Sequence, residues 1–187
     1  MANFLFSLKH QDLRTFGEYA DMYVGVVLRK GVRFKQIDVV FDRYRTQSTK
    51  SGTRKKKSKF VQPIRRVIEN RNVPLPSNLL SFLSLPENKE DLAFFLATEV
   101  IRQAAEGKVV ITEGGFISED QADSNDKSLN LDNLKATHEE ADTRMILHML
   151  HCKNVSNCRT IAVSATPTPM SFCFYCIMLT EWISKYG

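Results

Sequence analysis

The chain has 187 residues, which is enough for one domain with a sizeable hydrophobic core. Hydrophobic residues make up 43% of the sequence and charged residues 25%, proportions that exclude fibrous and wholly disordered architectures. No apolar run approaches the roughly 20 residues of a membrane span, so we expect no membrane partner. Four cysteines in this length do not suggest a disulfide scaffold, which favours a reducing, intracellular compartment.

The net charge of +5 is concentrated in one segment. Residues 43–66 carry ten Lys or Arg and no acid, which leaves a charge of −5 for the rest of the chain. A basic segment on an acidic body usually faces a polyanion, most often nucleic acid. A solvated loop, or a nuclear localisation signal around residues 54–57, explains the charge equally well. The residues expected to contact nucleic acid are Arg43, Arg45, Lys50, Arg54, Lys55, Lys56, Lys57 and Lys59.

Hydrophobic periodicity predicts helices that alternate with short strands. In chain order the pattern predicts a helix over 11–30, a buried strand over 37–41, a helix over 88–105, a strand over 109–111, a helix over 137–151 and a strand over 160–163. Gly31 is expected to end the first helix, and residues 118–133, which are acidic and rich in Ser and Asn, are expected to form a mobile loop. This alternation predicts an α/β layered sandwich with a mainly parallel sheet.

Acids gather where such a sheet would carry its active site, at the carboxyl ends of the strands. Asp42 follows the first predicted strand, and the helix over 137–151 begins with Glu139, Glu140 and Asp142. Converging carboxylates beside a basic groove suit two-metal phosphodiester hydrolysis by Mg²⁺ or Mn²⁺. The alternative is favourable charge at a helix N-terminus, which we prefer for Glu139.

Two side chains of the same helix have simpler predicted roles. Arg144 stands four residues after Glu140 and is expected to pair with it along the helix. His138 and His148 are predicted to be surface or packing residues rather than metal ligands.

Three stretches of the sequence resemble the PIN-like, flap-endonuclease-like nucleases, and in particular a group of animal proteins linked to mobile elements. Residues 39–42, Val-Val-Phe-Asp before a basic segment, are similar to the family's strand-end aspartate with its arch. Residues 140–143, Glu-Ala-Asp-Thr, are similar to its metal-binding E-A-E/D motif, and residues 160–164 match the strand before its D-x-D motif. The resemblance implies a PIN-like three-layer sandwich over 1–165, with Asp42, Glu140 and Asp142 as catalytic metal ligands and Glu139 as a possible substitute.

The sequence departs from this family at both ends. No acid lies between Arg159 and Glu181, so an apolar tail over 166–187 replaces the D-x-D strand. Codons for residues 166–176, read in a shifted frame, can spell Thr-Asp-Thr-Asp-Val followed by a Leu-rich run, which leads us to expect a frame shift after about residue 165. The family's first strand with its aspartate also has no counterpart before residue 11, so we expect an incomplete domain.

These observations leave three functional hypotheses. The first is a divalent-metal-dependent nuclease domain by descent, weak or inactive because the D-x-D acids are missing. The second is a non-catalytic nucleic-acid-binding module that uses the basic segment alone. The third is a decayed fragment without a selected function. The zinc site suggested by Cys173 and Cys176 is disfavoured, because the pair lies in the tail and no second close pair exists.

Overall fold

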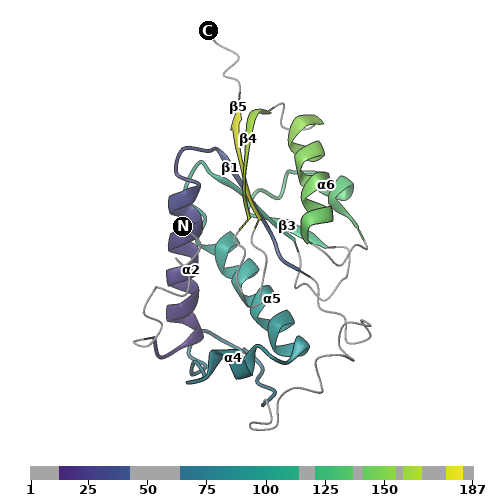
Figure 1. The fold of residues 1–187 in the computed structure, drawn as a ribbon. Helices are drawn as coiled ribbons and strands as arrows, with labels where there is room; N and C mark the ends of the chain where they lie inside the picture. The colour runs from purple at the N-terminus through teal and green to yellow at the C-terminus, as the bar shows by residue number, and fades with distance from the viewer. Residues whose placement is uncertain are drawn as a thin grey trace.

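A computed structural model of the chain describes residues 13–42, 64–113, 121–136, 141–154, 158–165 and 176–182. Over these residues the protein has a mixed α/β fold, with one five-stranded sheet and helices on both of its faces (Figure 1). The helices are α2 (Phe16–Lys30), α4 (Leu79–Phe82), α5 (Pro86–Arg102), α6 (Ala141–Asn154) and the 3-10 helix η2 (Asp132–Leu134). The strands are β1 (Gln36–Val40), β2 (Val109–Glu113), β3 (Ala122–Ser124), β4 (Cys158–Ala165) and β5 (Cys176–Trp182). None of the described helices has the length and apolar character needed to cross a membrane.

Helix α2 shows how local sequence determines the ends of an element. The Thr15 hydroxyl accepts a hydrogen bond from the Glu18 amide at 3.2 Å, and the Glu18 carboxylate accepts one from the Thr15 amide at 3.3 Å. This reciprocal capping box starts the helix at Phe16, and Gly31 caps its other end. The predicted helix and its end at Gly31 are therefore confirmed, with a later start than expected because Thr15 is the cap.

The sheet has the strand order β3-β2-β1-β5-β4. Only β1 and β2 pair in parallel among the described strands, whereas β3, β5 and β4 each join an antiparallel neighbour. The prediction of a mainly parallel sheet is therefore wrong. The reason is the tail over 166–187, of which residues 176–182 form β5 and insert antiparallel between β1 and β4. Strands β1, β2 and β4 still run in the same direction.

The predicted mobile loop over 118–133 contains a strand and a helical turn, which corrects that prediction. Strand β3 pairs with β2, and polar side chains reinforce the pairing. The Ser124 hydroxyl donates to the Val110 carbonyl at 2.8 Å, and the Asn125 side chain accepts from the Val110 amide at 2.7 Å. Because these bonds use Ser and Asn, the segment has the composition of a loop although it extends the sheet.

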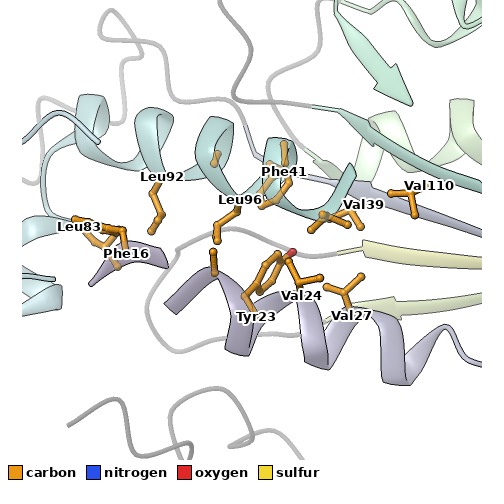
Figure 2. Close-up of a cluster of buried hydrophobic side chains, with 14 of the residues drawn as sticks. Phe16, Tyr23, Val24, Val27, Val39, Phe41, Leu83, Leu92, Leu96 and Val110 are labelled. Carbon is orange, nitrogen blue, oxygen red and sulfur yellow. The ribbon is translucent and has the colours of Figure 1, made fainter. Parts of the chain in front are cut away.

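One face of the sheet carries the hydrophobic core (Figure 2). Ile37, Val39 and Phe41 point toward α2 and α5 and are fully buried there. Figure 2 shows Tyr23 of α2 beside Phe41, and their ring centroids lie 6.3 Å apart. Leu96 of α5 is also completely buried in this cluster. Because side chains alternate along a strand, the residues between these positions face the opposite side, where α6 lies.

Candidate functional site

Strands β1, β2 and β4 end at the same edge of the sheet. Val40 is paired in register with both Glu113 and Cys176, and Ala165 is also paired with Cys176. Since β1, β2 and β4 run in one direction, this edge is the carboxyl edge of all three. It is the position at which parallel α/β sheets bind their ligands.

Asp42 connects this edge to the start of α6. It lies two residues beyond β1 and is partly buried. Its Oδ1 accepts a hydrogen bond from the backbone amide of Ala141, the first residue of α6, at 2.9 Å. A carboxylate at this place satisfies one of the free amide groups of the helix start and interacts favourably with the helix dipole. Asp42 is therefore a cap supplied to α6 by a distant part of the chain.

The remaining predicted site residues are only partly within the described structure. The backbone of Asp142 forms part of the first turn of α6, but its side chain lies outside the described residues, as do Glu139 and Glu140. Thr137, at which the predicted helix begins, also falls outside them. So do all the residues expected to contact nucleic acid, Arg43, Arg45, Lys50, Arg54, Lys55, Lys56, Lys57 and Lys59.

Two basic residues that end the segment over 43–66 are described, and both contact the body of the protein. Arg65 forms an ion pair with Asp91 of α5, with 2.6 Å between Nη1 and Oδ2. Arg66 donates to the Pro74 carbonyl at 2.7 Å. This end of the basic segment is therefore attached beside α5, on the hydrophobic-core side of the sheet.

Helix α6 places charged side chains against the other face of the sheet. Arg144 and His148, four residues apart, share one side of the helix, and both are fully buried. The Nδ1 atom of His148 lies 2.8 Å from Asp38 Oδ2 on β1, and its Nε2 atom lies 2.8 Å from Glu113 Oε2 on β2. Arg144 Nη1 lies 3.2 Å from the other Glu113 oxygen, and Arg144 Nη2 donates to the Phe41 carbonyl. We call Asp38, Glu113, Arg144 and His148 the buried tetrad.

Neutral polar groups extend the tetrad along α6. Gln36 of β1 donates from Nε2 to Asp38 Oδ1 at 2.7 Å, and the same nitrogen lies 3.4 Å from the sulfur of Cys152. The Cys152 sulfur lies 3.8 Å from the second Asp38 oxygen. Both Asp38 oxygens therefore have polar neighbours, as a buried carboxylate requires.

The tetrad is electrostatically balanced. Burial alone would lower the pKa of His148, but hydrogen bonds from the ring to Asp38 and Glu113 outweigh it and raise the pKa to about 9. His148 is therefore an imidazolium at neutral pH, and with Arg144 it balances the two carboxylates. Buried charges are tolerated when they are paired. Arg144 Nη1 has an ion-pair partner in Glu113, although among the described residues Nη1 and Nε make no hydrogen bond. Burial lowers the pKa of nearby His151, which favours its neutral form.

The tetrad contains two residues for which a role was predicted and two for which none was. Arg144 does not lie on the helix surface: its described partners are Glu113 and Phe41, while its predicted partner Glu140 lies outside the described residues. His148 is a packing residue as predicted, although in a charged environment, and His138 lies outside the described part. Sequence reasoning missed Asp38 and Glu113. The sequence signal that could have identified Asp38 is its position as the only acid within the apolar stretch over 37–41.

Asp42 is a carboxylate at the carboxyl edge, the type of oxygen ligand that Mg²⁺ and Mn²⁺ prefer. Glu140 and Asp142 have the same ligand chemistry, but their side chains lie outside the described residues. Asp38 and Glu113 are unsuitable, because His148 and Arg144 engage them. Within the described residues no group of three or more His, Cys, Asp or Glu could hold a metal ion. A metal site at this edge therefore needs acids from the start of α6 in addition to Asp42.

Comparison with known proteins gives no match to a family model, to a curated protein or to a solved structure. The resemblance to PIN-like nucleases is therefore limited to the three sequence stretches described above.

Proposed function

We propose that the chain is a PIN-like, divalent-metal-dependent nuclease domain that hydrolyses phosphodiester bonds of DNA or RNA. The observation that supports this proposal is the 2.9 Å hydrogen bond from the Ala141 amide to Asp42. It joins the strand-end aspartate of one motif to the central residue of the other, because Glu140 and Asp142 are the chain neighbours of Ala141. Two segments about a hundred residues apart in sequence thus meet at the edge where the motifs require them.

In this proposal Asp42, Glu140 and Asp142 would hold Mg²⁺ or Mn²⁺, with Glu139 as a further acid. Such an ion, when bound, supplies Lewis-acid stabilisation of phosphoryl oxygens and lowers the pKa of bound water. Strand β4 ends at the same edge, and the sequence after it includes no acid before Glu181. The chain thus lacks the ligands of the family's D-x-D motif, and we expect cleavage to be weak compared with a complete two-metal site.

A nuclease assay with matched carboxylate variants tests the proposal. Labelled single-stranded, duplex and flap DNA, and single-stranded RNA, would be incubated with the chain in Mg²⁺, in Mn²⁺ or in EDTA. We expect slow cleavage with the metal ions only, and its loss in Asp142→Asn. Asp126→Asn is the control, because Asp126 follows β3 beside the start of β2, at the opposite edge of the sheet. Cleavage that survives Asp142→Asn, or that is absent with every substrate, would contradict the proposal.

The second candidate is nucleic-acid binding without cleavage, by the basic segment, in an intracellular setting that would be the nucleus if residues 54–57 act as a localisation signal. The observation that favours it is the concentration of ten cations in residues 43–66 on a body of charge −5. We expect binding that needs no metal and weakens steeply with salt, because phosphate contacts release counterions. Replacing Lys55, Lys56 and Lys57 by Gln should reduce both the affinity and the salt dependence. If neither cleavage nor salt-sensitive binding is measured, the decayed-fragment hypothesis gains support.

A further inference from the structure

Two contacts from one turn of α6 hold two consecutive residues at the end of β1. The backbone amide of Ala141 donates to the Asp42 side chain, and the guanidinium of Arg144 donates to the carbonyl of Phe41. The two donors are three residues apart on the helix and therefore lie on the same side of it. Together they determine where the Asp42 carboxylate lies relative to the start of α6.

Arg144 is itself fixed by a buried partner. Its side chain is completely buried, and its Nη1 lies 3.2 Å from Glu113, which is completely buried as well. Glu113 ends β2 and lies in register with Val40 of β1. Through its two terminal nitrogens, Arg144 thus joins the ends of both parallel strands to α6. A guanidinium has the rigid fork that such a double contact needs, whereas an apolar side chain would supply packing alone.

We infer that Arg144 is a positioning residue for the proposed metal site, because it holds the chain at Phe41 and Asp42 against Ala141, the first residue of α6. The inference rests on the proposed function and deepens it. Arg144 touches neither substrate nor metal in this account. Its contribution is to the place of the Asp42 carboxylate relative to the start of α6, on which the affinity of the proposed site for a divalent ion would depend.

The buried tetrad offers a matched pair of variants with balanced charge. Arg144→Met with Glu113→Gln removes the contact to Phe41 and leaves the ion pair of His148 with Asp38. Asp38→Asn with His148→Gln removes that second pair and leaves Arg144 joined to Glu113 and Phe41. Each double variant deletes one buried positive and one buried negative charge, so both should be able to fold. Circular dichroism and thermal unfolding would confirm folding before any comparison.

Two readouts separate positioning from a purely structural role. Calorimetric titration with Mn²⁺ should show an affinity about tenfold weaker for the Arg144 and Glu113 double variant, the size of effect expected for a residue supporting a metal ligand. The Asp38 and His148 double variant should bind as wild type does. Hydrogen exchange of the Ala141 amide, measured without metal, should be faster in the Arg144 and Glu113 double variant only.

The outcomes distinguish this inference from the proposed function. Equal Mn²⁺ affinity and equal Ala141 exchange in the two double variants would overturn the positioning role while leaving the metal site intact. Wild-type protein that binds no Mn²⁺ would overturn the proposed function and, with it, the role of Arg144 in metal affinity. In that case faster Ala141 exchange would show that Arg144 only caps and anchors α6.

Discussion

The two faces of strand β1 pack against surfaces of very different chemistry. Ile37, Val39 and Phe41 meet α2 and α5 in an apolar core, while Gln36 and Asp38 of the same strand meet a charged side of α6. The stability that the apolar face contributes depends on how completely apolar groups fill its volume. The stability that the charged face contributes depends on whether its charges remain paired. The comparison teaches that the two faces should respond to different kinds of substitution.

The largest effect is expected from unbalancing the buried tetrad. Arg144→Met alone removes one of the two positive charges that balance Asp38 and Glu113 in the protein interior, and removing one member of a buried ion pair costs about 3–5 kcal/mol. Urea unfolding should show this loss in the free energy of unfolding. Adding Glu113→Gln should recover more than half of it. A loss below about 1 kcal/mol, as for an exposed ion pair, would contradict the charged-face account.

The apolar face should respond to lost volume instead. Leu96 is completely buried on α5, and Leu96→Ala should lower the free energy of unfolding by about 3 kcal/mol through lost burial and a cavity. Leu96→Met keeps the volume and should cost less than about 1.5 kcal/mol. Thermal unfolding of the two variants would measure the contrast. Similar losses from both would show that volume does not control this face.

The charged face should make the stability of the fold depend on pH between about 6.5 and 9. The pKa of His148 is about 9 in the folded chain, above its ordinary value of 6.5. The unfolded chain therefore loses this proton first as pH rises, and the stabilisation present below pH 6.5 is lost by about pH 9. The free energy of unfolding should fall by about 3 kcal/mol across this range. His148→Gln should flatten the profile, and an equally steep profile in that variant would assign the dependence to other groups.

The smallest expected effects concern the helix starts on the two faces. Thr15 caps α2 from the adjacent position, whereas Asp42 caps α6 from a distant strand. Removing either cap with Thr15→Ala or Asp42→Ala should cost about 1 kcal/mol in unfolding experiments. Hydrogen exchange should locate the loss at the start of α2 in the first variant and of α6 in the second. Exchange that increases throughout the chain would indicate global destabilisation rather than a local cap.

The elements of the apolar face were well predicted from the sequence, because each of them is indicated by a pattern within a single segment of the chain. The helix ending at Gly31 and the strand after it follow from apolar spacing within single segments. The charged face depends instead on pairs such as Asp38 with His148, which are 110 residues apart and leave no local pattern. Apolar spacing is misleading on α6, where Ile146 and Leu150 are exposed and Arg144 is buried.

The candidate site was predictable only in part. The Val-Val-Phe-Asp and Glu-Ala-Asp stretches single out Asp42 and the start of α6, and the structure joins them by one hydrogen bond. The roles of Glu113 and Arg144 beside it were not predictable, because they depend on the parallel register of β1 and β2. The position of β5 between β1 and β4 was also not predictable, since nothing in residues 176–182 specifies a strand partner.

Paramagnetic broadening by Mn²⁺ in the amide NMR spectrum tests the central claim most directly, because it locates the ion without requiring catalysis. Substoichiometric Mn²⁺ should first broaden the amide signals of Asp42 and Ala141, and Mg²⁺ in excess should restore them. The signal of Gly107, which precedes β2 at the opposite edge of the sheet, should stay sharp under the same conditions. Unchanged Asp42 and Ala141 signals, or broadening that is equal at Gly107, would contradict a metal site at the carboxyl edge.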